Sequence, residues 1–232
     1  MTDQPEPRDL TPTEIAQMSV MERLSLFDGL GIGLCGAHRT GKTSLCEALS
    51  AKNAFLPFVR TSAKEAAQKF GFDVDNPGSF ADRMGWQEYL LEQFAATYEQ
   101  QDGIFIADRT PLDMAAYMLA DAPLGEIDPE LDKRVQAYLK RCKELTERHF
   151  TALVLIQPGI QHVPAPGSPA PNRAYQEKLN ALMLGIGWDY DRPLSAIPRE
   201  VTDFDARLNI IATTISKSIA GYKVLLSHLP KQ

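Results

Sequence analysis

Cysteine is scarce in this 232-residue sequence, which contains only Cys35, Cys46 and Cys142. The number is odd, and no two of them have the C-x-x-C spacing of zinc or redox sites. We therefore expect free thiols in a reducing compartment rather than a disulfide-stapled secreted fold.

Long apolar runs are also lacking. None approaches the roughly 18 residues that a membrane-spanning helix needs. The polar segment 1–10 has neither the basic nor the apolar region of a secretion signal. These absences predict a cytoplasmic protein that makes no contact with a membrane.

The third deficit is positive charge, since the net charge is −6 at pH 7. Proteins that hold nucleic acid mainly by bulk charge need a basic surface. The composition argues against that mode of DNA binding, although it leaves room for a local basic groove.

Short apolar runs alternate with helical patterns along the chain. The runs show no polar alternation, which is typical of strands that are buried on both faces of a parallel sheet. We expect strands near 30–35, 55–59 (the weakest), 103–108 and 152–156, and helices ending near 51, over 80–98, from Pro111, over 129–149 and over 203–220. The prediction is one three-layer α/β domain over 29–232, with a parallel sheet of about five strands.

Residues 1–28 are expected to form an N-terminal extension. Thr11 and Pro12 fit the start of a helix, and Ile15, Met18 and Met21 begin an apolar stripe at three-residue steps. We expect this helix to pack on its own domain, with packing on a partner as the alternative.

The strongest motif is the segment Gly36–Thr43, which matches G-x-x-x-x-G-K-[ST] in full between an expected strand and an expected helix. Its glycines let the backbone N–H groups turn toward phosphate oxygens, and the helix N-terminus adds positive charge. Lys42 is expected on the β- and γ-phosphates and Thr43 on Mg²⁺. The predicted ligands are therefore ATP and Mg²⁺, held by Gly36, Ala37, His38, Arg39, Thr40, Gly41, Lys42, Thr43 and Ser44.

Two side chains inside this loop have open roles. Arg39 either contacts phosphate or remains solvated. His38 is better read as a support for the loop than as a base.

Asp108, Arg109 and Thr110 follow directly on the strand expected at 104–107. A carboxylate at this edge of the sheet lies beside the phosphate loop, where it can bind Mg²⁺ or position an attacking hydroxyl. Arg109 can neutralise charge on a transferring phosphoryl group. Thr110, just before Pro111, fits the helix cap and leaves Asp108 for chemistry.

Weaker candidates surround these residues. Arg60 ends the weak strand and either faces the acceptor or is a surface arginine. Gln87 is a candidate for binding a base, while its neighbour Trp86 is more typical of helix-core packing. Asp113 is either a site residue or an acid favoured in the first turn of a helix.

A lid is expected at about 158–192, because phosphoryl transfer must exclude water. It contains the run 163–171, whose four prolines exclude a helix or a central strand. Arg173 is its first basic residue, a candidate for closing over the phosphates or for an exposed ion pair.

The loop Gly36–Ser44, the D-R-T segment and the late lid together resemble the nucleoside and nucleotide kinase branch of P-loop proteins. The thymidylate-kinase-like and nicotinamide-riboside-kinase-like groups are the nearest, and the resemblance covers about 30–220. It implies that Asp108 serves the metal and the acceptor hydroxyl, and that Arg109 serves the phosphates.

The segment 107–113 and the loop also resemble phage-encoded P-loop kinases. Some of these phosphorylate the hydroxymethyl group of 5-hydroxymethyluracil in DNA, a step in thymidine hypermodification. This resemblance implies modified DNA as the partner and the host cytoplasm as the location.

We therefore expect transfer of the ATP γ-phosphate to a hydroxyl of a nucleoside-type acceptor. The hydroxymethyluracil of phage DNA comes first, and a free deoxynucleoside or deoxynucleoside monophosphate is the alternative. A P-loop ATPase coupled to a partner is an alternative from a different functional class. A switch GTPase would carry an N-K-x-D element, which the sequence lacks.

Overall fold

The computed structural model describes residues 30–73, 78–101, 103–160 and 172–228. The extension expected at 1–28 and the proline-rich run 163–171 lie outside the described residues, and so do residues 161 and 162 of the expected lid.

A five-stranded sheet forms the centre of the domain, in the order β2-β3-β1-β4-β5 with every neighbouring pair parallel. The strands are β1 (Leu30–Cys35), β2 (Phe58–Val59), β3 (Ile104–Ala107), β4 (Phe150–Ile156) and β5 (Leu194–Ile197). The expected α/β class and five-stranded parallel sheet are confirmed. The strand β5 was not located from the sequence, because this edge strand is only partly buried and has no continuous apolar run.

The central strands are buried on both faces. In β3, Ile104 and Ile106 belong to one core cluster, whereas Phe105 and Ala107 belong to the other. All seven residues of β4 are buried, and the strand alternates in the same way from Ala152 to Ile156. Since both faces of the sheet need apolar cover, helices must lie on each side.

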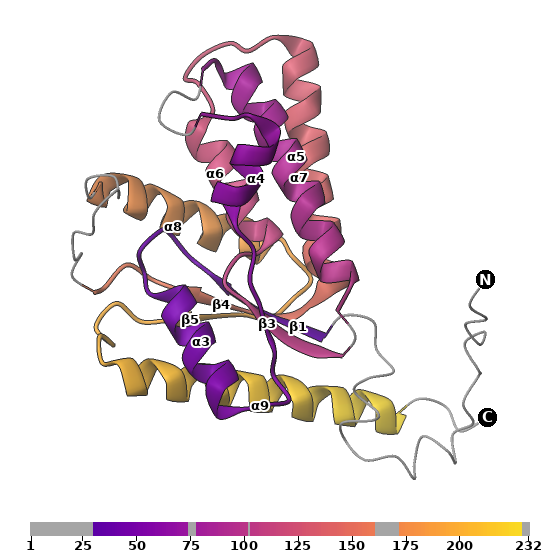
Figure 1. The fold of residues 1–232 in the computed structure, drawn as a ribbon, viewed down its shortest axis with the longest axis vertical. Helices are drawn as coiled ribbons and strands as arrows, with labels where there is room; N and C mark the ends of the chain where they lie inside the picture. The colour runs from indigo at the N-terminus through magenta and orange to yellow at the C-terminus, as the bar shows by residue number, and fades with distance from the viewer. Residues whose placement is uncertain (1–29, 74–77, 102, 161–171, 229–232) are drawn as a thin grey trace.

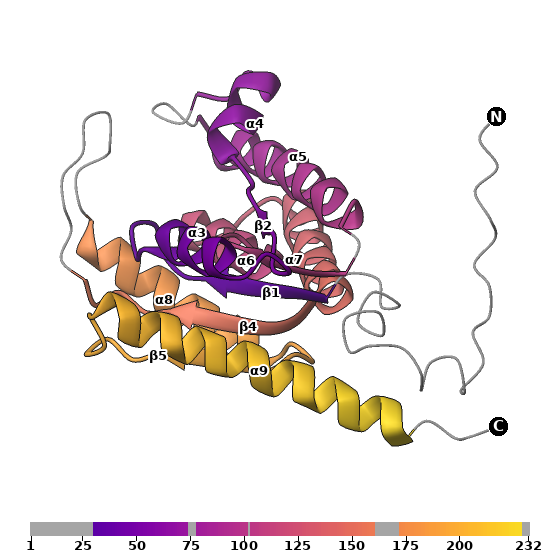
Figure 2. The ribbon, with the colours of Figure 1, turned by 60° about the horizontal axis from the view of Figure 1, so that its bottom comes forward.

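Within the described residues, two helices cover one face of the sheet and five lie on the other (Figures 1 and 2). The first layer contains α3 (Lys42–Lys52) and α9 (Phe204–His228). The second contains α4 (Ala63–Phe70), α5 (Phe80–Glu99), α6 (Pro111–Asp121), α7 (Pro129–His149) and α8 (Arg173–Trp188).

The helices α4 and α8 were not expected. α4 has only eight residues, and Ala66 and Ala67 are buried among those whose burial the structure describes, so its apolar pattern covers little more than two turns. α8 occupies the second half of the expected lid and packs mainly on α6.

The start of α6 lies against β1 because Gly33 has no side chain. A Cβ at that position would stand 2.4 Å from Cγ2 of Thr110 and 2.8 Å from a methyl of Leu153. This close approach brings the segment 108–110 beside the end of β1, where the phosphate loop begins.

Candidate functional site

The phosphate loop joins β1 to α3 in a tight curl. Gly36 and Gly41 have φ values of 147° and 88°, which favour glycine, and Arg39 has a φ of 60°. A Cβ on Gly36 would lie 2.6 Å from the carbonyl oxygen of Ile156. Both glycines of the motif are therefore required by backbone geometry.

Lys42, the first residue of α3, folds back over the loop. Its Nζ donates to the carbonyl oxygens of Gly36 at 2.6 Å and Ala37 at 2.8 Å. Burial lowers the pKa of Lys42 to about 8, against favourable contributions from Asp113 and Asp108. The ammonium is thus held beside the loop by two carbonyl oxygens, and a phosphate oxygen can take their place as its hydrogen-bond acceptor.

Thr43 and Asp108 meet across the loop. The Thr43 hydroxyl donates to Oδ2 of Asp108 at 2.5 Å. The other carboxylate oxygen, Oδ1, is buried and has no hydrogen-bond partner within the described part of the chain. A hydroxyl and a carboxylate with an open oxygen are the donor types that Mg²⁺ takes from P-loop proteins.

Arg109 lies next to them with its backbone and side chain both anchored. The hydroxyl of Tyr98 donates to the Arg109 carbonyl at 2.8 Å. The guanidinium stands 5.5 Å from the ring centroid of Tyr117. Tyr117 also accepts from the backbone N–H of His38 at 3.0 Å, so it links Arg109 to the loop.

A cavity of about 570 Å³ collects these groups. It is lined by His38, Arg39, Gly41, Lys42, Thr43, Ser44, Arg60, Thr61, Ser62, Ala63, Glu65, Asp108 and Arg109. The cavity runs from the phosphate loop past Asp108 to the start of α4. Arg60 stands at its edge, where it pairs with Glu47 and lies over the Phe58 ring.

Gly36, Ala37 and Thr40 belong to the predicted set but not to the lining, because they lie behind the loop surface. Ala37 and Thr40 are almost fully buried. The Thr40 hydroxyl donates to the Ala37 carbonyl at 3.0 Å. These residues shape the loop from within.

Gln87 and Arg173, two of the three weak candidates outside the cavity lining, make contacts elsewhere. Gln87 on α5 accepts from the Tyr138 hydroxyl of α7 at 3.3 Å. Arg173 on α8 pairs with Glu177 at 3.3 Å and donates to the Pro158 carbonyl at 3.1 Å. Trp86 stacks on Phe72 at 5.0 Å between centroids, which agrees with core packing.

Asp113 lies beneath the loop rather than in the cavity lining. Its Oδ1 accepts from the backbone N–H of Gly36 at 2.9 Å. Its Oδ2 accepts from the N–H of Thr110 at 2.9 Å and from the Thr110 hydroxyl at 2.7 Å. Thr110 in turn caps α6, as expected. Asp113 therefore ties the phosphate loop to the D-R-T segment.

Two further contacts to the loop could not be found from the sequence. Gln176 of α8 donates to the His38 carbonyl at 2.9 Å, and Arg207 of α9 donates to the Thr40 carbonyl at 3.0 Å. The partners are 138 and 167 residues apart in the chain, and neither side chain belongs to a recognisable motif.

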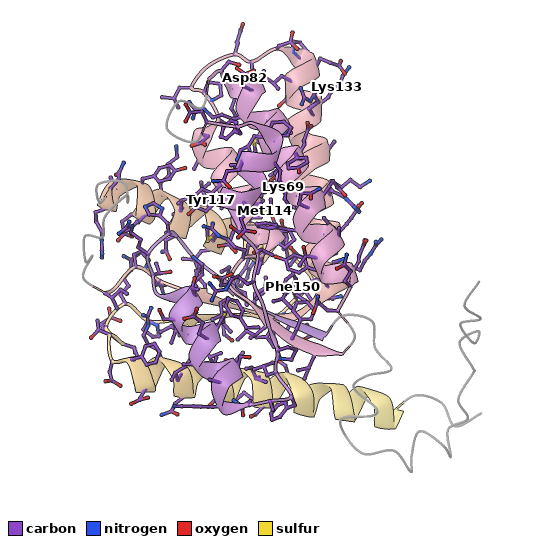
Figure 3. All side chains as sticks on the ribbon, viewed as in Figure 1. Lys69, Asp82, Met114, Tyr117, Lys133 and Phe150 are labelled. Carbon is purple, nitrogen blue, oxygen red and sulfur yellow. The ribbon has the colours of Figure 1, made fainter. Side chains whose placement is uncertain are left out.

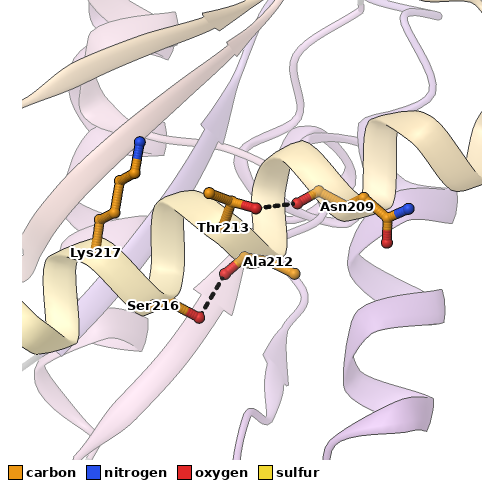
Figure 4. Close-up of a pocket in the computed structure, with 5 residues that line it drawn as sticks. All are labelled: Asn209, Ala212, Thr213, Ser216 and Lys217. Atoms are coloured by element: carbon orange, nitrogen blue, oxygen red, sulfur yellow. Dashed lines mark hydrogen bonds between the residues drawn. The ribbon is translucent and has the colours of Figure 1, made fainter.

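A second hollow of about 520 Å³ lies on one side of α9 (Figure 4). Two of its hydroxyls are already bonded within the helix, from Thr213 to the Asn209 carbonyl and from Ser216 to the Ala212 carbonyl. Its lining residues all come from α9, and Lys217 is the titratable group among them, so we assign no chemistry to this hollow.

The fold and the loop together define a P-loop protein with the fold of the P-loop kinases. A family model described as an AAA domain matches residues 32–156, more than half of the chain. The chain belongs to this AAA domain family. No curated protein matches it.

Solved structures show the same fold at low identity. Deoxyadenosine kinase from M. mycoides is 17% identical with a TM-score of 0.58, over 81% of this chain and 99% of that one. Thymidylate kinase from Candida albicans is 16% identical with a TM-score of 0.57, over 83% and 94%. A NadR protein is 15% identical with a TM-score of 0.55, over 78% of this chain and 50% of that one.

Among the described residues, none of the helices is both long and apolar enough to cross a lipid bilayer.

Proposed function

We propose that this protein is an ATP-dependent kinase that transfers the γ-phosphate to a hydroxyl group of a nucleoside-type acceptor. One observation carries the proposal. Asp108 meets the hydroxyl of Thr43 in a cavity that also contains Lys42 and Arg109 and continues to the start of α4. A switch protein that only hydrolyses its nucleotide needs the part of this cavity that binds phosphate. A kinase also needs room for an acceptor beside the carboxylate of Asp108.

The residues of the site divide the work of phosphoryl transfer. The loop amides and Lys42 hold the phosphates of ATP, and Arg109 stabilises negative charge on the transferring group. Asp108 receives the acceptor hydroxyl and accepts its proton as the new O–P bond forms. The bond from the γ-phosphorus to the β–γ bridging oxygen breaks at the same time, and ADP leaves with that oxygen. Positioning and electrostatics supply most of the rate, because the protein forms no covalent bond to the phosphoryl group.

Mg²⁺ fits the donors that are present. The Thr43 hydroxyl lies beside the loop with the carboxylate of Asp108, whose Oδ1 has no hydrogen-bond partner among the described residues. These two groups would hold the ion, which would supply positive charge that neutralises the phosphates of ATP. Few protein ligands are needed, since Mg²⁺ at such sites keeps waters and phosphate oxygens in its shell.

The acceptor is the finer part of the proposal. The resemblance of segment 107–113 to phage kinases puts the hydroxymethyl group of 5-hydroxymethyluracil in DNA first. The fold shared with deoxyadenosine kinase and thymidylate kinase supports a free deoxynucleoside or deoxynucleoside monophosphate as the alternative. The acceptor end of the cavity is polar, formed by Arg60, Thr61, Ser62 and Glu65.

The test is phosphate transfer from γ-labelled ATP to a panel of acceptors, with products identified by mass spectrometry. The panel contains free deoxynucleosides, deoxynucleoside monophosphates, ordinary DNA and DNA with 5-hydroxymethyluracil. Label on the modified base alone identifies a DNA kinase, and label on a free nucleoside or nucleotide identifies a kinase of small acceptors.

The matched control is Asp108→Asn, which keeps the size of the side chain but removes its charge. Transfer that falls in this variant supports the assigned role of Asp108. Phosphate released to water with every acceptor contradicts the kinase proposal and favours a P-loop ATPase coupled to a partner.

A further inference from the structure

Arg39 has a backbone conformation that is costly for its residue type. Its φ of 60° makes it the one non-glycine residue with positive φ in the described part of the chain. L-residues with a Cβ adopt this left-handed region at a cost in free energy, and they keep it only where surrounding structure holds them. Something must therefore hold the loop at Arg39.

The carbonyl groups on either side of Arg39 are both held by buried side chains. The His38 carbonyl accepts from Nε2 of Gln176, and the Thr40 carbonyl accepts from Nη2 of Arg207. Gln176 is 7% exposed and Arg207 is 3% exposed. Their helices, α8 and α9, lie on opposite sides of the sheet (Figure 1). The phosphate loop is thus held by hydrogen bonds from helices on both faces of the sheet.

These two bonds set the direction of two amide groups. In a trans peptide the N–H points opposite to the carbonyl of the same unit. Fixing the His38 and Thr40 carbonyls therefore fixes the N–H groups of Arg39 and Gly41. A phosphate loop works through N–H groups that point at the anion. A cationic donor on the Thr40 carbonyl also polarises that peptide and strengthens its N–H as a donor.

Arg207 adds a second indication that an anion belongs nearby. Its Nε is buried and has no hydrogen-bond partner among the residues described. Its Nη1 lies 3.3 Å from the position that a Cβ on Gly41 would take. Burial lowers the pKa of this guanidinium. A buried cation of this kind is costly unless a negative charge lies close to it, and a nucleotide phosphate in the loop provides one.

We propose that Gln176 and Arg207 are positioning residues that clamp the phosphate loop in its nucleotide-binding conformation. The inference rests on the proposed function only in that the loop must bind ATP. It assigns to α8 and α9 a part in nucleotide binding that their sequences do not indicate.

The first experiment measures the affinity for ATP of the full chain by calorimetry. Arg207→Met removes the cation and its donors at similar length, and Gln176→Met removes the amide at similar volume. We expect ATP to bind roughly tenfold more weakly to the first variant and about fivefold more weakly to the second. Arg207→Lys, which keeps the charge and a donor, should recover part of the loss.

Two matched controls separate the clamp from general stability. Asn180→Leu changes another buried amide, one turn further along α8. Arg192→Met removes an arginine that donates to the Phe150 carbonyl, outside the loop. Both controls should lower the melting temperature without changing the affinity for ATP. Clamp variants that lose no more ATP affinity than these controls overturn the inference.

The strain at Arg39 allows a further test, because a purely structural role of Gln176 would not depend on the residue at position 39. Gln176→Met is combined with Arg39→Ala, which keeps the cost of the left-handed backbone, and with Arg39→Gly, which removes it. The loss of ATP affinity should remain about fivefold in the alanine background and shrink to less than about twofold in the glycine background. Equal losses in both backgrounds contradict a clamp on Arg39.

The outcomes for the clamp and for the proposed function are distinct. A native chain that binds ATP but phosphorylates no acceptor contradicts the kinase proposal and leaves the clamp standing. A native chain that binds no ATP overturns both. If a methionine variant does not fold, as judged by circular dichroism, Arg207→Lys and Gln176→Glu carry the same test. Gln176→Glu has no donor for the His38 carbonyl, so native ATP affinity in that variant overturns the clamp.

Discussion

Asp113→Asn is the most direct test of how the loop and the D-R-T segment hold each other. Three donors converge on this buried carboxylate, namely the N–H of Gly36 on Oδ1, and the N–H and the hydroxyl of Thr110 on Oδ2. An asparagine has the same shape but only one acceptor atom. Whichever way its amide turns, its NH₂ group faces one of the two backbone N–H groups.

The magnitude follows from this mismatch. A buried N–H left without a partner costs about 1–3 kcal/mol. Removing the charge offsets part of this cost. Burial raises the pKa of Asp113 and so disfavours its ionised form, although Lys42 and Arg109 oppose that shift. We therefore expect a net loss near 2 kcal/mol, which in a chain of this size lowers the melting temperature by roughly 4–8 °C.

The assay is thermal unfolding followed by circular dichroism, with ATP affinity measured in parallel. The control is Asp82→Asn, because Asp82 makes the same capping box with Ser79 at the start of α5. Asp82 is exposed at the outer end of that helix, far from the sheet (Figure 3). The control should change stability less than Asp113→Asn and leave ATP binding intact. A variant at Asp113 that melts no lower than the control refutes the reasoning.

Three further predictions concern the chemistry of the site. Lys42→Ala should reduce phosphate transfer by roughly a hundredfold or more without unfolding the chain, as measured by turnover and circular dichroism; full activity would contradict the mechanism. The pKa of Lys42 is about 8 in the folded chain, whereas its ordinary value is 10.5. The native state therefore binds fewer protons than the unfolded state between these two pH values. The unfolding free energy should rise with pH across that window. ATP affinity should weaken above about pH 8, because the ammonium of Lys42 is lost. An ATP affinity that does not change up to pH 10 would exclude a phosphate contact by this ammonium. Asp108→Asn should raise the Mg²⁺ concentration needed for half-maximal transfer while ATP binding without the metal stays unchanged, as followed by titration of Mg²⁺ at saturating ATP.

The sequence alone was sufficient for the parts that local rules decide. Apolar runs without polar alternation predicted four of the five strands, because a strand buried on both faces has no polar side. Gly36, Gly41, Lys42 and Thr43 predicted the phosphate loop, because the motif encodes both the backbone curl and the charge. The helix starts at Pro111 and Pro129 were predicted as well, since a cap and its proline are neighbours in the chain.

Other features depended on contacts that sequence patterns do not carry. The edge strand β5 is only partly buried, so its composition does not differ from that of a loop. Asp113 fits a first-turn acid equally well whether or not its second oxygen reaches Gly36. Gln176 and Arg207 reach the loop only after α8 and α9 have packed on opposite faces of the sheet.

The division has a physical cause. The phosphate loop is specified within eight consecutive residues, and backbone sterics and the start of one helix determine its form. The groups that hold the loop come from three other helices, and their distances depend on how the whole sheet is covered. The sequence by itself therefore determined that this chain contains a P-loop and what form its backbone takes. Only the tertiary structure decided which side chains hold that loop in place, because their contacts are made by packing between elements far apart in the chain.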